Sequence, residues 1–91
     1  MPRDTPGRIF CRVVDVEGHP VAGARVFFVS GPGSFPDIAA LTDGNGSAVL
    51  TAPSPGAYSV QVVADGFVPQ TVTAIVAEQE TTTQNIVLER S

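Results

Sequence analysis

Few side chains in this sequence combine in a way that supports catalysis. The single histidine, His19, stands in a turn before Pro20 without a second acid–base group, so a general acid–base cycle lacks a partner. The single cysteine, Cys11, alternates with Ile9 and Val13, and this spacing predicts an inert core thiol and not an exposed nucleophile. One cysteine also rules out a disulfide within the chain. We therefore expect no catalytic residue and no enzyme activity.

One segment, Asp43-Gly44-Asn45-Gly46, offers the oxygen atoms that calcium prefers. A calcium loop needs a spaced run of oxygen ligands that ends in a bidentate Glu, and that run is missing here. Asp, Asn and Gly are the default residues of tight turns, so the segment predicts a turn. The sequence also lacks a His and Cys cluster for a transition metal. We expect neither a metal nor another cofactor.

The charge of the chain narrows the choice of partner. The net charge is −4, and all five cations are arginines scattered along the sequence. Nucleic acids and anionic membranes are bound by clustered cations, so neither is expected as a partner. No apolar run approaches the roughly 20 residues that cross a bilayer. Only 15% of the residues are charged, which leaves a surface poorly defended against association and makes protein the expected partner, with carbohydrate as a second option.

The elements that position these side chains are short β-strands. Clusters of Gly, Pro, Asn and Asp alternate with Val-, Ile-, Phe- and Thr-rich runs about every ten residues, which is typical of a sandwich or barrel. We expect a flexible segment over 1–7 and one domain over 8–90. The predicted strands cover 8–14, 24–30, 38–42, 47–52, 57–64, 70–77 and 82–89, with 43–46 joining the third and fourth as a hairpin. The predicted fold is an all-β, seven-stranded antiparallel Greek-key β-sandwich.

Alternation within the strands separates a core from a surface. The predicted core consists of Ile9, Cys11, Val13, Val21, Val26, Phe28, Val49, Tyr58, Val60, Val62, Phe67, Val72, Ile86 and Leu88. The opposite faces of the first two strands are unusually apolar for a one-sided sheet. They predict one protein-contact patch made of Phe10, Arg12, Val14, Phe27 and Val29, unless loops cover it or the register is shifted by one. In the loop over 30–39, Phe35 is either a further contact anchor or a cap on the core.

Four motifs occur in order along the chain. They are V-x-D-x-x-G-x-P-V-x-G-A-x-V over 13–26, T-D-x-x-G over 42–46, P-G-x-Y over 55–58 and A-x-G-F over 64–67. From Arg8 to Glu89 the sequence resembles the carboxypeptidase regulatory-like domain family, which shares the transthyretin-like (prealbumin-like) sandwich. The resemblance implies an accessory module of an extracellular or cell-envelope protein. The N-terminus carries no apolar leader, so a cytoplasmic protein, another export route and an excised domain all stay open.

The resemblance also weakens two chemical alternatives. The 5-hydroxyisourate hydrolases of this fold carry a catalytic His where Arg12 stands here, and they end in Tyr-Arg-Gly-Ser, unlike Leu88-Glu89-Arg90-Ser91. Collagen-adhesin B-type repeats crosslink a Lys, and this chain has none. We therefore expect a non-catalytic module that self-associates or docks on a larger protein through a β-sheet face, in a surface appendage, filament, or secretion or phage-like machine. A carbohydrate- or peptide-binding accessory domain of a secreted enzyme is the alternative, and a transthyretin-like hydrolase is a remote one.

Overall fold

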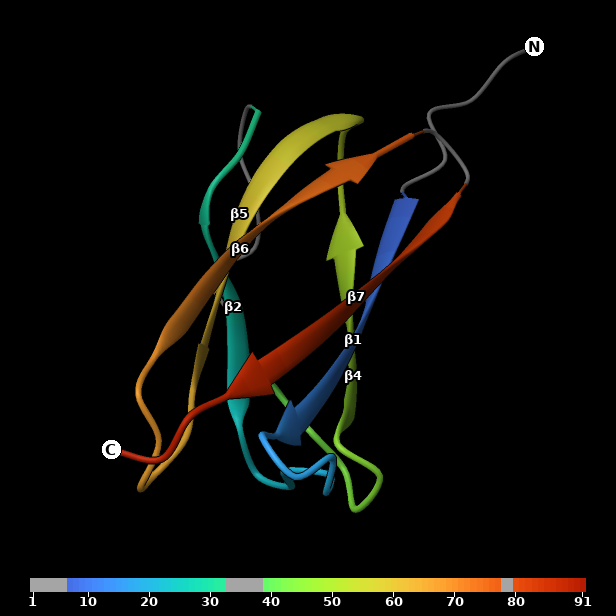
Figure 1. The fold of residues 1–91 in the computed structure, drawn as a ribbon. Helices are drawn as coiled ribbons and strands as arrows, with labels where there is room; N and C mark the ends of the chain where they lie inside the picture. Colours follow the sequence, from blue (N-terminus) through green and yellow to red (C-terminus); the bar gives the residue numbers. More distant parts are fainter. Residues whose placement is uncertain (1–6, 33–38, 78–79) are drawn as a thin grey trace, which may run out of the picture.

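Two β-sheets pack face to face in the computed structural model, which describes residues 7–32, 39–77 and 80–91 (Figure 1). One sheet has the strand order β4-β1-β7, and the other has the order β3-β2-β5-β6. The strands are β1 Gly7–Asp15, β2 Arg25–Ser30, β3 Ala40–Leu41, β4 Ser47–Ala52, β5 Gly56–Val63, β6 Gln70–Val76 and β7 Thr81–Leu88. The predicted seven-stranded β-sandwich is confirmed. No helix in the described residues has the length and apolar character needed to cross a membrane.

Strand pairing departs from the prediction at two places, of which the first is the pairing of β1 with β7. β1 pairs with β4 in antiparallel fashion, but it pairs with β7 in parallel, with Arg8 opposite Thr81 and Asp15 opposite Leu88. The physical reason is the connection before β7. After β6 the chain crosses to the other sheet and returns in the direction of β1, so the sheet β4-β1-β7 is mixed and not purely antiparallel.

The predicted hairpin over 43–46 is wrong. Among the described strands β3 pairs only with β2 and β4 pairs only with β1, so this turn carries the chain from one sheet to the other. The side chain of Thr42 explains the crossing, because its hydroxyl donates to the Val21 carbonyl at 2.7 Å and accepts from the Ala24 N–H at 2.9 Å. These bonds hold the end of β3 against the turn that leads into β2, in the sheet β3-β2-β5-β6. The oxygen Oδ1 of Asp43 then accepts from the N–H groups of Asn45 and Ser47 and closes the turn.

The core lies between the sheets and follows the predicted alternation closely. Its largest fully buried side chains are Tyr58, Ile9, Ile86, Leu88, Val13, Val26, Val60, Val62 and Cys11. The ring of Tyr58 packs at 4.8 Å from that of Phe28, and its hydroxyl donates to the Ser54 carbonyl at 2.6 Å. Burial raises the pKa of the Cys11 thiol to about 11, which fits the predicted inert core role.

One predicted core residue faces solvent instead. Val49 is 49% exposed, whereas its neighbours Ala48, Leu50 and Ala52 are buried. The register of β4 against β1 decides this, because Leu50 stands opposite the inward-facing Ile9 and Val49 stands opposite Phe10. A shift of one residue moves every side chain of a strand to the other face. The remaining predicted core residues are buried, apart from Phe67 and Val72, which are partly buried and pack against the core.

Candidate protein-contact surface

The predicted contact residues do not form one patch. Phe10, Arg12 and Val14 lie on β1, whereas Phe27 and Val29 lie on β2, and these strands belong to different sheets. Their outward faces therefore lie on opposite sides of the sandwich, with the core between them. The prediction of a shared face fails because the turn after β1 carries the chain to the other sheet. Phe35 lies outside the described residues.

The outer face of β4-β1-β7, which we call the β1 face, mixes apolar and cationic side chains. Its apolar and cationic residues are Arg8, Phe10, Arg12, Val14, Val49 and Val87, and its remaining positions are the polar residues Ser47, Thr51, Thr81, Thr83 and Asn85. Half-buried Phe10 stands between Val49 on β4 and Thr83 on β7, and Val14 stands beside Val87. Val49 and Val87 are 49% and 46% exposed, which is high for apolar residues in strand interiors. The face thus offers a stripe of apolar area that the domain itself does not cover.

Charge on the β1 face has one sign. Arg8 and Arg12 are exposed two residues to either side of Phe10, so both guanidinium groups belong to the same face. None of the outward-facing positions of β1, β4 and β7 carries an acidic residue. Within the described residues, neither arginine forms an ion pair. The β1 face is therefore cationic on a chain whose net charge is −4.

The outer face of the other sheet has a different character. Arg25 on β2 stands between Leu41 on β3 and Val63 on β5, and Leu41 is 65% exposed. Half-buried Phe27 stands opposite Gln61, and a register shift between Phe28 and Ser30 leaves Val29 exposed. Towards β6 the face carries Ser59, Thr71 and Thr73, followed by Ile75, which is 65% exposed. Its cation is single, and its apolar groups are split by polar ones.

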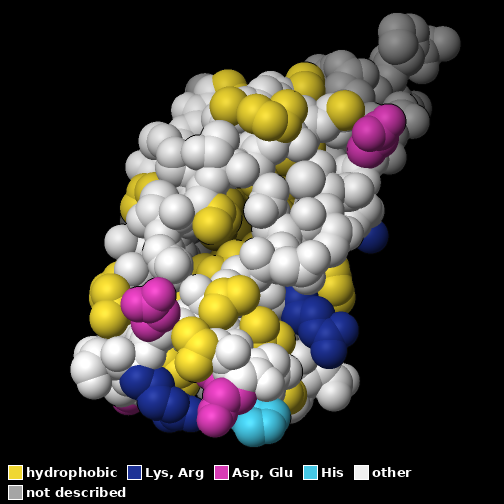
Figure 2. All heavy atoms as spheres, viewed as in Figure 1, with side chains coloured by type: hydrophobic (Ala, Val, Ile, Leu, Met, Phe, Trp, Pro, Cys, Tyr) yellow, Lys and Arg dark blue, Asp and Glu magenta, His cyan; other side chains and the backbone are white. Residues whose placement is uncertain are grey.

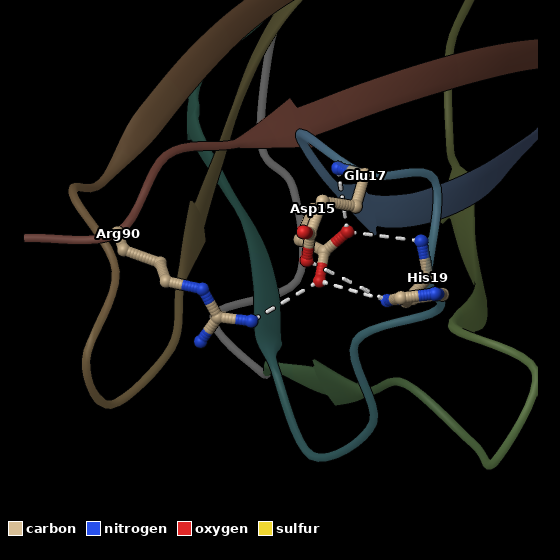
Figure 3. A network of polar contacts seen from close by, with 4 residues as sticks. All are labelled: Asp15, Glu17, His19 and Arg90. Atoms are coloured by element: carbon tan, nitrogen blue, oxygen red, sulfur yellow. Dashed lines mark hydrogen bonds and ion pairs between the residues drawn. The ribbon is translucent and has the colours of Figure 1, made fainter.

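A compact polar cluster lies at the end of β1 (Figure 3). The buried carboxylate of Asp15 accepts at Oδ1 from the N–H groups of Glu17 and His19, both at 2.9 Å. Its oxygen Oδ2 accepts from Nη2 of Arg90 at 3.2 Å. The His19 hydrogen bond, aided by the other contacts, lowers the pKa of Asp15 despite its burial. Asp15 thus ties the β1–β2 turn to the C-terminal residues.

The same cluster holds the only grouping of possible metal ligands in the described part of the chain. Nδ1 of His19 lies 3.7 Å from Oδ2 of Asp15 and 3.8 Å from Oε1 of Glu17. Sequence reasoning did not identify this grouping, although the spacing D-x-E-x-H in one turn signals it. Asp15 already accepts three hydrogen bonds, one of them from a cationic guanidinium. The grouping of Asp15, Glu17 and His19 is therefore explained by the hydrogen bonds with which Asp15 stabilises the β1–β2 turn.

The motif residues share one role in this structure, which is to hold turns. Asp15 and Asp43 each bond two backbone N–H groups, Thr42 bonds Val21 and Ala24 in the turn before β2, and Tyr58 bonds Ser54. These features define a class of protein, the small transthyretin-like β-sandwich module whose characteristic residues build a scaffold. Residues 8–89 match the carboxypeptidase regulatory-like domain. The chain belongs to that family, as the resemblance predicted.

Solved structures with the same fold come from proteins of different kinds. The TIE protein of Bacillus anthracis has a TM-score of 0.76 at 21% identity over 94% of this chain and 17% of its own. The minor pilin GBS52 of Streptococcus agalactiae has 0.71 at 17% over 96% and 45%, and chlorocatechol 1,2-dioxygenase of Pseudomonas putida has 0.70 at 18% over 98% and 62%. The chain spans less than two thirds of each of these proteins. No curated protein matches the sequence.

Proposed function

We propose that this domain is a non-catalytic assembly module that docks on a second copy of itself through the β1 face. The observation that carries the proposal is the pair of arginines on that face, Arg8 and Arg12, which flank Phe10 without an acidic partner in the described residues. A buried apolar centre with Arg beside it is the usual composition of a protein-contact site. The arginines call for a partner surface that carries carboxylates.

One end of the same molecule provides such a surface. Strands β1, β5 and β7 end there and β2, β4 and β6 begin there, so several turns meet at that end (Figure 1). The exposed acidic residues of these turns and the adjoining C-terminal residues are Glu17, Asp43, Asp65 and Glu89. Figure 2 shows acidic and basic side chains gathered at this end, whereas the middle of the visible face carries no charged side chain. Two exposed arginines, Arg25 and Arg90, lie at the same end, but the acidic residues outnumber them and can face the cationic β1 face of another copy.

The geometry of this contact has a consequence for the assembly. An end that docks on a face is a heterologous contact, because the two copies use different surfaces. Such contacts leave one end and one face free, so they extend into rings or filaments. The minor pilin among the structural neighbours supports an assembly role, whereas the dioxygenase shows that the fold also occurs in enzymes. The arginine-flanked β1 face therefore carries the proposal, and the fold alone does not.

Charge reversal on the β1 face tests the proposal. We expect the purified wild-type chain to grow beyond a dimer in a light-scattering concentration series, and Arg8→Glu with Arg12→Glu to stop this growth. The matched control is Thr73→Glu with Ile75→Glu, which places two acidic side chains at exposed positions on the outer face of the other sheet. Growth that stops equally in the control, or that continues in the double variant, contradicts docking through the β1 face. Circular dichroism of each variant verifies that the sandwich is intact.

A further inference from the structure

The four edge strands of the sandwich differ in how their free backbone groups are protected. An edge strand exposes unpaired N–H and C=O groups, which can pair with another chain. β3 is only two residues long. On β6, the carbonyls of Ile75 and Thr73 accept bonds from the side chains of Thr82 at 2.9 Å and Gln84 at 3.3 Å. On β7, the Val87 carbonyl accepts from the Gln70 side chain at 3.4 Å.

β4 lacks each of these protections. Its sequence, Ser-Ala-Val-Leu-Thr-Ala, contains no charge and no proline, and its pairing with β1 shows no bulge. Its first residue, Ser47, bonds Asp43 through both its N–H and its C=O, at 3.0 Å each. Backbone groups alternate sides along a strand, so Val49 and Thr51 point the same way as Ser47, away from β1. No side chain in the described residues bonds them.

We propose that β4 pairs in antiparallel fashion with β4 of a second copy, about a twofold axis at Leu50. In this register Val49 stands opposite the second copy's Thr51, and Thr51 stands opposite the second copy's Val49. Each of the four residues then exchanges its free N–H and C=O with its partner across the axis. The pairing rests on the proposed assembly role, but it uses the edge of the sheet and not the β1 face.

A second copy fits this edge for two reasons. The strand segment is self-complementary about Leu50, since its free donors and acceptors lie symmetrically on Val49 and Thr51. The edge also carries no charge, so two chains of net charge −4 meet there without placing like charges opposite each other. A twofold axis normal to the sheet keeps both β1 faces on one side. The joined sheet therefore presents a doubled cationic face to further copies.

Matched charge variants test the register directly. The side chains of Val49 and Thr51 are exposed, so a Lys pair (V49K with T51K) and a Glu pair (V49E with T51E) are compatible with the fold. Each pair alone places like charges opposite each other twice, and we expect the dimer to weaken about tenfold. A mixture of the two variants places Lys opposite Glu and restores a heterodimer in native mass spectrometry. The control carries T71K with T73K on the β6 edge and keeps the wild-type dimer.

Three outcomes overturn the proposal. They are a wild-type monomer at millimolar concentration, no heterodimer from two folded variants, and equal weakening in the β6 control. A readout on the wild-type chain covers the case in which a variant fails to fold. We expect the amide hydrogens of Val49 and Thr51 to exchange slowly with solvent in the dimer, and at least tenfold faster after dilution to the monomer.

The experiments can contradict either proposed contact, through the β1 face or through β4, independently of the other. Pairing through β4 closes at two copies, whereas docking through the β1 face grows further. If the β1 face drives growth and β4 drives dimerisation, the double variant Arg8→Glu with Arg12→Glu stops growth beyond the dimer and retains the β4 dimer. A dimer that survives the β4 variants but not the arginine variants overturns the edge pairing and leaves the proposed function standing.

Discussion

At the scale of single residues, side-chain types that are often catalytic in other proteins form hydrogen bonds with the backbone in this one. Asp15 bonds the N–H groups of Glu17 and His19, and the buried hydroxyl of Thr42 bonds both the Val21 carbonyl and the Ala24 N–H of the turn before β2. Buried polar groups are stable only with such partners. No buried side-chain nitrogen or oxygen in the described residues lacks one. The family motifs therefore mark places where a turn needs a side-chain acceptor.

The carboxylate of Asp15 gives the domain an acid-sensitive contact. Its pKa is lower in the folded chain than the value of about 3.9 for an unfolded Asp. The stability it contributes is complete above that unfolded value and is lost as the pH falls through the folded one. We expect Asp15→Asn to lower the unfolding midpoint at pH 7, and the gap to the wild type to close as the pH falls through the lowered pKa of Asp15. Urea unfolding across pH measures this.

The control for this prediction is Glu17→Gln, which changes an exposed carboxylate of the same turn. Glu17 accepts no backbone hydrogen bond in the described residues, so we expect Glu17→Gln to leave the unfolding midpoint at pH 7 unchanged. A gap that stays constant down to pH 2 means that the loss in Asp15→Asn comes from packing and not from charge.

At the scale of elements, the turn over 43–46 determines the architecture as much as any strand does. Gly46 has φ +75°, and its N–H donates to the Asp43 carbonyl at 2.9 Å. Its own carbonyl accepts from Val13 at 2.7 Å, so the turn is joined directly to β1. This contact sets the register in which Leu50 faces the core and Val49 faces solvent.

Replacement of Gly46 therefore tests the role of the turn. A Cβ at Gly46 collides with the carbonyl oxygen of Val13, and the positive φ adds strain. We expect Gly46→Ala to lower the free energy of unfolding by about 1–3 kcal/mol. Gly44→Ala is the control, since no described atom lies within 4 Å of its Cβ, and we expect less than about 0.5 kcal/mol. Equal losses in both variants contradict the steric argument.

At the scale of the whole molecule, the two proposed contacts draw on different forces. Docking of the acidic end on the β1 face depends on exposed charges, with Arg8 and Arg12 on one side and Glu17, Asp43 and Asp65 on the other. Pairing through β4 depends on backbone hydrogen bonds of an uncharged strand. The two contacts together describe an assembly with a closed dimer as its unit and open growth between units.

Salt separates these forces. Raising the ionic strength from about 0.05 to about 0.5 M shortens the distance over which exposed charges interact to a few ångströms. We expect sedimentation velocity to show loss of the larger assemblies and retention of the dimer. Larger assemblies that resist salt indicate that apolar contact through Phe10 dominates docking. A dimer that dissociates at the higher ionic strength argues against pairing of the uncharged β4 edges.

The sequence by itself determined the strands and most of the core, because alternation is a local property of the chain. The burial of Ile9, Cys11 and Val13, and of Tyr58 and Val60, follows from that alternation. The turns at 15–20 and 43–46 were also readable, since Asp and Gly signal them directly. The same turn signal did not say whether the two strands that flank 43–46 share a sheet.

Tertiary structure alone decided which strands become neighbours. Phe10 and Phe27 each alternate with core residues along their strands, so the sequence predicts that both point outward. They nevertheless lie on opposite sides of the sandwich, because β1 and β2 belong to different sheets. The exposure of Val49 depends on the register of β4 against β1, and the unprotected edge of β4 depends on which strand ends each sheet. Pairing between distant strands is a long-range choice made by the packing of the whole core. Local alternation predicts whether a side chain points into or out of its strand's sheet, and only the fold determines which outward-pointing side chains share one surface.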